Sequence, residues 1–294
     1  MNADRPAHGI FLAPAKVNLA LRVVGKRADG YHLLQSILVF FPLYDQLEIE
    51  VLRDEDGLEL VCEPVVTASP EENLVMRAAR ALLNATGVQR GARLRLLKRI
   101  PDGAGLGGGS SDAALVLLAL NRLWGLHLDL QQLMALGVGL GADIPFFLGG
   151  RSALVQGIGE QLTPIPVHPS ADLVLVHPGV ALSTRRVFHA WAGKFLDRRE
   201  PLAMPGPAVT DLVTLLENDL ESPAMALAPV IGEVLYALKK AGALGVRMSG
   251  SGSSVFGVFP DTATAASVAQ RLSVEQKGWR VFSGRIFHTH PFFD

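Results

Sequence analysis

The stretch PDGAGLGGGSSDAAL (residues 101–115) decides the fold, because it places five glycines directly before an apolar segment typical of a helix. Ordering glycine costs more backbone entropy than ordering other residues, so a gain elsewhere must offset that cost. Ser110, Ser111 and Asp112 are good N-cap residues, which predicts a helix start here. The first amides of a helix are unpaired and lie at the positive end of its dipole. The stretch therefore predicts a loop whose backbone binds phosphate.

Other glycine-rich loops fit this stretch less well. A flexible surface loop would not need to lie between a strand and a helix. Gly103, Gly105 and Gly108 satisfy the G-x-G-x-x-G spacing, but a turn and another helix follow where a Rossmann unit needs its second strand. Gly109 stands where a P-loop has its lysine. Protein kinases have a different glycine-rich loop over the phosphates, one that does not precede a helix.

The composition predicts a globular protein of one large or two ordinary domains. The chain has 294 residues, of which 49% are hydrophobic and 19% charged. Its apolar runs are shorter than the roughly 20 residues that span a bilayer, and its start does not resemble a signal peptide. Cys62 is the only cysteine and the net charge is −1. We therefore expect a cytoplasmic enzyme with no membrane or nucleic-acid partner. The oligomeric state is left open.

Hydrophobic periodicity predicts an α+β protein. Strands are expected near 17–23 and 33–52, then a helix capped by Ser69 and ended by Gly87, and a strand before the glycines. A third helix begins near Asp129, and a strand pair covers 151–165. Further helices are expected around 213–220 and 230–241, and the chain closes in strand–helix–strand order. The proline-rich segment 164–172 suggests a boundary, which gives domains 1–165 and 166–294.

The glycine stretch closely resembles the P-x-G-x-G-L-G motif of the GHMP kinases. Two further segments are similar to that family's motifs: APAKVNLAL at 13–21 and RMSGSGSSVFGVF at 247–259. The resemblance extends over nearly the whole chain and thins out between residues 195 and 209. It implies a two-domain fold, with an N-terminal ribosomal-protein-S5-domain-2-like domain that binds ATP and a C-terminal ferredoxin-like α/β-plait domain.

The resemblance also implies ATP and Mg²⁺ as cofactors and suggests which residues bind the nucleotide. These are the glycine loop, its serines and three polar residues for adenine: Pro101, Asp102, Gly103, Ala104, Gly105, Leu106, Gly107, Gly108, Gly109, Ser110, Ser111, Asn73, Lys98 and Asp112. Ser110 and Ser111 would contact phosphate and Mg²⁺. No acidic ligand of the metal is assigned.

Lys16 and Asp143 are the expected catalytic residues. Taken alone, a lysine in a strand is commonly a solvated edge residue, and an aspartate among glycines is commonly a turn or cap residue. The resemblance instead places the two together at the reacting hydroxyl. Phosphoryl transfer to an alcohol needs a group that accepts the hydroxyl proton, and a carboxylate can do so. A neighbouring lysine offsets charge on the transferring phosphoryl group.

The strings RADGYHLLQS, LGADIPFF and HPGV resemble a branch of the family whose small-molecule substrate is a cytidyl diphosphate sugar alcohol, phosphorylated on its 2-hydroxyl. The resemblance implies that Tyr31 and Phe188 stack on cytosine, that His32 hydrogen-bonds it, and that Asn18 binds the sugar alcohol. Arg185 stands where the resembled pattern has a proline, and an arginine can also stack on a ring.

Two alternative functions remain open. One is another GHMP kinase, of the homoserine or mevalonate type, against which GYH and LGADIPFF count. The other is a catalytically silent ligand sensor, which would be expected to lack Lys16 or Asp143. His288 and His290 have no third ligand nearby in sequence, so we interpret them as structural residues rather than a zinc site.

Overall fold

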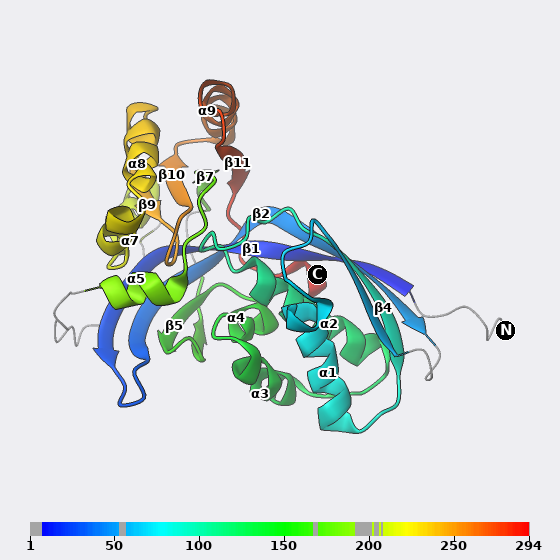
Figure 1. Ribbon diagram of the computed structural model, residues 1–294. Helices are drawn as coiled ribbons and strands as arrows, with labels where there is room; N and C mark the ends of the chain where they lie inside the picture. Colours follow the sequence, from blue (N-terminus) through cyan, green and yellow to red (C-terminus); the bar gives the residue numbers. More distant parts are fainter. Residues whose placement is uncertain are drawn as a thin grey trace.

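The computed structural model describes residues 8–52, 57–166, 170–191, 202, 206 and 208–293. Most of the segment 195–209, where the resemblance thins out, lies outside these ranges. Two β-sheets and their helices make up the fold, so the predicted α+β class is confirmed (Figure 1). Within the described ranges, no helix has both the length and the apolar character needed to cross a bilayer.

The first sheet is built on a long antiparallel hairpin of β1 (His8–Lys26) and β2 (His32–Leu52). Its strand order is β3-β4-β2-β1-β8, where β3 is Leu58–Glu63, β4 is Gly91–Leu97 and β8 is Glu217–Asn218. The strand pair β5 (Ala153–Gly157) and β6 (Gln161–Pro164) extends β2 on its other half.

Four helices cover one face of this sheet: α1 (Leu74–Thr86), α2 (Gly108–Leu123), α3 (Leu130–Leu140) and α4 (Ile144–Gly149) (Figure 1). Asp129 caps α3 through a capping box with Gln132, so this helix begins where the sequence predicts. Gly87 ends α1 in the left-handed conformation, which confirms the predicted end of that helix.

The second sheet has the strand order β11-β7-β10-β9 and is antiparallel throughout. Its strands are β7 (Asp172–His177), β9 (Gly245–Met248), β10 (Val255–Phe259) and β11 (Arg280–Arg285). The helices in this half are α5 (Thr184–Ala190), α6 (Val209–Leu215), α7 (Glu221–Leu227), α8 (Val230–Lys240) and α9 (Thr262–Glu275).

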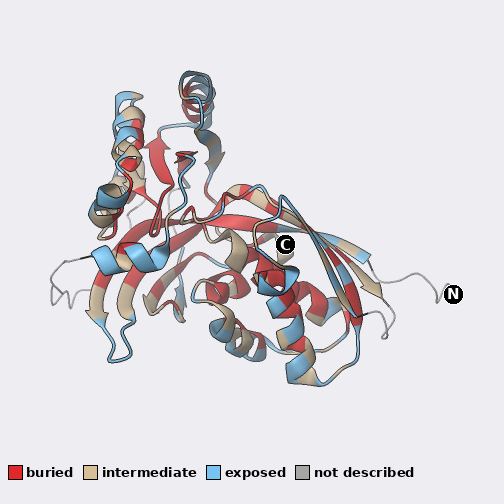
Figure 2. Cartoon of the chain, viewed as in Figure 1, coloured by how far each residue is buried: buried red, intermediate tan, exposed pale blue. Residues whose placement is uncertain are grey.

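The hairpin β1–β2 is buried on both faces in its central part (Figure 2). In β2, Leu38 and Phe40 belong to the core that packs on the helices α1–α4. Their neighbours Ile37 and Val39 belong to a second core, shared with Leu175 of β7. Because side chains alternate across a strand, one apolar hairpin thus fills two cores and joins the two halves of the chain.

Three predicted helix boundaries are wrong. Ser69 precedes a short 3₁₀ turn (Pro70–Glu72), and α1 starts only after Asn73, whose side chain accepts a hydrogen bond from the Val75 amide at 3.0 Å. Helix α2 starts earlier than expected, after Gly107, because the left-handed backbone of that glycine turns the chain into the helix. The helix expected over 213–220 ends at Leu215, because the next residues pair with β1 as β8.

The C-terminal segment returns to the first sheet. Phe287 bridges Phe40, and Thr289 bridges Arg151. His290 is fully buried, with its ring edge-on to Phe40 at 5.7 Å and its Nδ1 accepting a hydrogen bond from the Phe292 amide at 3.1 Å. The HTH sequence is therefore part of the core packing in the described chain.

This packing predicts that acid destabilises the fold through His290. Burial lowers the pKa of His290 to about 4 from the ordinary value of 6.5. Between these values the unfolded chain binds a proton that the folded chain does not, so stability is full above pH 6.5 and falls as the pH falls towards 4. Lowering the pH from 7.5 to 5 should cost about 2 kcal/mol through this residue.

Urea unfolding of the wild type and of His290→Gln at both pH values measures this effect. Between pH 7.5 and pH 5, the unfolding free energy of the variant should fall by about 2 kcal/mol less than that of the wild type. The same substitution at the exposed His127 is the control and should leave the pH dependence as in the wild type. An equal pH dependence in His290→Gln and the wild type would contradict the prediction.

Candidate active site

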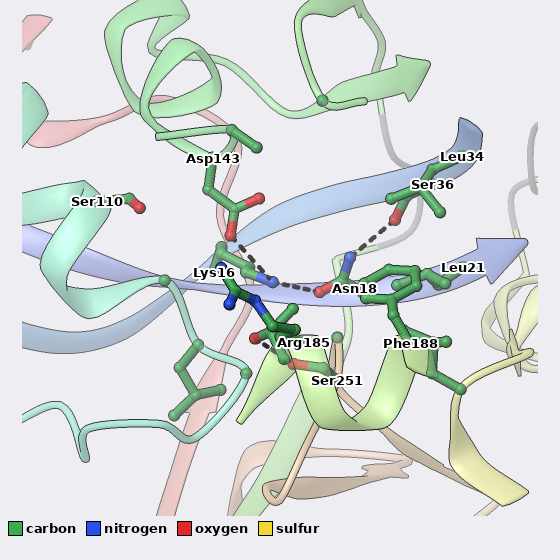
Figure 3. Close-up of a pocket in the computed structure, with 18 of the residues that line it drawn as sticks. Lys16, Asn18, Leu21, Leu34, Ser36, Ser110, Asp143, Arg185, Phe188 and Ser251 are labelled. Atoms are coloured by element: carbon green, nitrogen blue, oxygen red, sulfur yellow. Dashed lines mark hydrogen bonds and ion pairs between the residues drawn. The ribbon is translucent and has the colours of Figure 1, made fainter. Parts of the chain in front are cut away.

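A cavity of about 980 Å³ lies where the hairpin, the glycine loop and α5 meet. Lys16 and Asn18 reach it from β1, Asp143 from the start of α4, and Phe188 from α5 (Figure 3). The loop after β9 adds Gly250 and Ser251. Segments from both ends of the chain therefore form one concave site, which is the usual setting for a small-molecule enzyme.

The glycine loop runs along the cavity with its backbone exposed to it. All residues from Pro101 to Ser110 line the cavity. The Lys16 amide donates to the Leu106 carbonyl at 2.9 Å, which fastens the loop to β1. Gly107 has φ +70°, and a Cβ there would lie 3.0 Å from both the Lys16 side chain and the Phe147 ring. A glycine is needed at this point because both the conformation and the space exclude a side chain.

Helix α2 begins beside this loop without a side-chain cap. Ser110, Ser111 and Asp112, expected as N-caps, lie inside its first two turns. Ser110 lines the cavity, whereas Ser111 is fully buried and its Oγ has no hydrogen-bond partner among the described residues. The first amides of α2 thus have no side-chain cap among the described residues, at the end of a 16-residue helix where its dipole can favour a negative charge.

Lys16 and Asp143 do meet in the cavity. The Lys16 ammonium lies 3.7 Å from Asp143 Oδ2 and donates to Asn18 Oδ1 at 2.5 Å (Figure 3). The Lys16 side chain is 4% exposed and that of Asp143 is 41% exposed, so the carboxylate faces the open cavity. Asn18 is itself fixed, since its Nδ2 donates to Ser36 Oγ at 2.8 Å. The arrangement offers a carboxylate that can accept a proton next to a fixed cation.

Aromatic side chains line the opposite end of the cavity. The His32 ring stacks on Phe188 with 5.1 Å between centroids, and Trp191 lies edge-on to His32 at 5.7 Å. Tyr31 is 62% exposed at the rim. Burial and the charge of Lys26 lower the pKa of His32, so its ring is neutral at pH 7. A neutral imidazole offers one hydrogen-bond donor and one acceptor, which suits the edge of a base.

A buried group of charges lies at the base of the glycine loop. Lys98 Nζ donates to Asp45 Oδ2 at 2.5 Å and to Asp112 Oδ2 at 2.7 Å. Asp45 also accepts hydrogen bonds from the backbone amides of Arg99 and Ile100. These contacts fix the chain just before Pro101, where the loop enters the cavity.

The close contacts within this buried group shift the pKa values of Lys98 and Asp112. Burial opposes the charge on Lys98, but Asp112 and Asp45 outweigh it and raise the pKa of Lys98. Burial raises the pKa of Asp112, and Asp45 adds to this rise while Lys98 opposes it. Lys98 therefore stays cationic and holds two acids together in a place of low dielectric.

Of the three residues expected to bind adenine, only one lines the cavity. Lys98 lines the cavity, but Asn73 and Asp112 are buried and are not among its lining residues.

Sequence reasoning missed Asp45, Trp191 and Ser251. Trp191 follows Phe188 by three residues. This helical spacing could have predicted that a second aromatic side chain lies beside Phe188 in the cavity. Within the part of the chain that the structure describes, no three His, Cys, Asp or Glu side chains form a metal-binding cluster.

Comparison with known proteins identifies the family. Residues 73–151 match the model of the GHMP kinases N-terminal domain, and residues 207–276 match that of the GHMP kinases C-terminal domain. The chain belongs to the GHMP kinases, which confirms the resemblance seen in its motifs.

Two curated relatives that cover most of the chain share one name. A 4-diphosphocytidyl-2-C-methyl-D-erythritol kinase of Chromobacterium violaceum is 44% identical over 291 residues, covering 99% of each chain. One of Syntrophotalea carbinolica is 42% identical over 275 residues, covering 93% of this chain and 97% of its own.

Solved structures agree with the fold. A crystal structure of 4-(cytidine 5'-diphospho)-2C-methyl-D-erythritol kinase matches with a TM-score of 0.77 at 39% identity, covering 95% of this chain and 99% of its own. A mevalonate kinase of L. major matches with a TM-score of 0.73 at 16% identity, covering 98% of each chain, and shares the fold.

Proposed function

We propose that this GHMP kinase transfers the terminal phosphoryl group of ATP to the 2-hydroxyl of 4-diphosphocytidyl-2-C-methyl-D-erythritol. The products are the 2-phosphate and ADP, in the non-mevalonate route to isoprenoid precursors. The relatives that cover nearly the whole chain carry this activity in their names. We place the reaction in the cytoplasm, in keeping with a chain whose only cysteine is Cys62.

The contact between Lys16 and Asp143 beside the glycine loop carries the proposal. Asp143 accepts the proton of the 2-hydroxyl, whose oxygen attacks the terminal phosphorus while the bond to the ADP oxygen breaks. Lys16, 3.7 Å from Asp143, offsets charge on the transferring group. The glycine loop and the first amides of α2 hold the nucleotide phosphates.

Mg²⁺ is a further part of the proposal. Ser110 lines the cavity beside the glycine loop, and its hydroxyl is an oxygen ligand of the kind that Mg²⁺ accepts. Because the described residues form no larger acidic cluster, most of its ligands would be phosphate oxygens and water. When bound, the ion neutralises charge on the phosphates.

The aromatic end of the cavity suits a cytosine ring. Phe188 and Tyr31 offer flat surfaces for stacking, and the neutral His32 offers hydrogen bonds. Asn18, next to Lys16, is placed to bind the sugar alcohol. The catalytically silent alternative receives no support, since Lys16 and Asp143 are both present and in contact.

An assay of ADP release with four alcohols tests this function. We expect turnover with 4-diphosphocytidyl-2-C-methyl-D-erythritol and none with mevalonate, homoserine or galactose. Turnover with only one of the last three would refute the proposed substrate, and no turnover with any of them would favour a silent sensor.

Asp143→Asn should lower kcat by about 10²–10⁴ because the amide cannot accept the hydroxyl proton. Nucleotide affinity measured by calorimetry should stay nearly unchanged, since the loop amides bind the phosphates. Near-normal kcat in the folded variant would exclude Asp143 as the base.

Tyr31→Ala and Phe188→Ala should each raise KM for the cytidyl substrate about tenfold to a hundredfold. Stacking on a base contributes roughly 1–3 kcal/mol, and 1.4 kcal/mol is a factor of ten. KM for ATP and the melting temperature should change little for Tyr31→Ala. Tyr236→Ala is a matched control, because Tyr236 is similarly exposed, at 68%, on α8. Parallel loss of affinity for both ligands with a large drop in melting temperature would instead indicate core residues.

A further inference from the structure

We propose that Arg185 binds phosphate oxygens inside the cavity, between the aromatic end and the contact of Lys16 with Asp143. The inference deepens the proposed function and rests on it. Arg185 is an exposed residue on α5 and lines the cavity. In Figure 3 its guanidinium group points towards Lys16 and away from Phe188.

Two hydrogen bonds fix the position of α5 against the phosphate-binding part of the site. The Leu182 amide, just before α5, donates to the Gly103 carbonyl of the glycine loop at 3.1 Å. The hydroxyl groups of Thr184 and Ser251 lie 2.9 Å apart. Since Arg185 directly follows Thr184, the chain that leads into Arg185 is held by two segments that line the cavity.

The second of these contacts leads directly to the catalytic lysine. Ser251 follows Gly250, where a Cβ would lie 3.1 Å from Lys16 Nζ. The base of Arg185 is thus tied to the glycine loop through Gly103 and to the neighbourhood of the Lys16 ammonium through Gly250. Under the proposed function, this region holds the phosphate groups of the ligands.

The charges of the cavity leave Arg185 available for a ligand. Asp143 lies against Lys16, and Asp29 pairs with Arg27 at 2.8 Å. Among the described residues, Arg185 makes no ion pair with a carboxylate. A guanidinium group has five donors in a planar arrangement that matches two phosphate oxygens at once. An anionic ligand is therefore the partner that its chemistry fits.

Stacking on cytosine is the competing role for Arg185. Phe188 follows by three residues, so both side chains lie on the same side of α5. However, the guanidinium group points away from the Phe188 ring, the proposed stacking surface for the base. The observed direction favours a phosphate over the base.

Two phosphate groups of the proposed reaction fit this position. One is the diphosphate that joins cytidine to the sugar alcohol, and the other is the terminal phosphate of ATP. In both cases Arg185 would bind phosphate oxygens. The two cases differ in which ligand binds more weakly when the arginine is replaced.

The test compares Arg185→Gln with Arg186→Gln by calorimetry. Arg186 is an exposed arginine on the same helix that does not line the cavity, so it controls for general charge. The probes are cytidine, CDP, ADP and a non-hydrolysable ATP analogue. Loss of a charged hydrogen bond predicts a 10–100-fold weaker affinity for one phosphate ligand in Arg185→Gln. Arg185→Lys should recover part of it, and Arg186→Gln should match the wild type.

Selective loss of CDP affinity relative to cytidine assigns Arg185 to the substrate diphosphate. Selective loss of affinity for the ATP analogue relative to ADP assigns it to the terminal phosphate. Equal losses for cytidine and CDP, or unchanged affinity for all four probes, would overturn the proposal. A wild type that does not bind CDP would contradict the proposed substrate instead, and the comparison of the ATP analogue with ADP would still decide the role of Arg185.

Discussion

The backbone of the glycine loop packs directly against the backbone of the loop after β9, and no side chain fits between them. Gly105 has φ +75°, and a Cβ there would overlap the Ser249 carbonyl and lie 3.0 Å from the Gly252 nitrogen. Ser249 Oγ donates to the Gly105 carbonyl at 3.1 Å, and the Ser254 amide donates to Ala104 at 3.1 Å. Segments nearly 150 residues apart in sequence are thereby held at backbone contact distance.

The strand that carries Lys16 joins the same contact. The Lys16 amide donates to Leu106 at 2.9 Å, and the Asn18 amide donates to Ser249 Oγ at 3.2 Å. The three motifs of the sequence are therefore hydrogen-bonded to one another around the cavity. This explains in physical terms why they occur together, since the position of Lys16 depends on both glycine-rich loops.

The parts of the site that sequence reasoning could predict are those with a local signal. Glycines before an apolar helix indicate a phosphate-binding loop, and the structure places that loop along the cavity. Asp45 carries no such signal, because its partner Lys98 lies 53 residues later and only the pairing of β2 with β4 brings them together. Placing Lys16 beside Asp143 from the sequence required the family resemblance, since 127 residues separate them.

Boundaries were predicted less well for a related reason. Helix α2 starts after the left-handed backbone of Gly107, where Lys16 and Phe147 leave little room for a side chain. The composition of the sequence does not reveal this conformation. The short strand β8 exists only because its two residues meet the edge of β1. The division of the chain at residue 165 stays a prediction, and β8 and the segment after β11 both contact the first sheet.

The close packing of the two glycine-rich loops is tested most directly by the change in unfolding free energy of Gly105→Ala, measured in urea. Gly139→Ala in α3 is the matched control, because a Cβ there meets nothing within 4 Å. The control should gain roughly 0.4–1 kcal/mol, as expected for a compatible site, whereas Gly105→Ala should lose about 2 kcal/mol or more through strain and overlap. A Gly105→Ala variant as stable as the wild type would contradict the account.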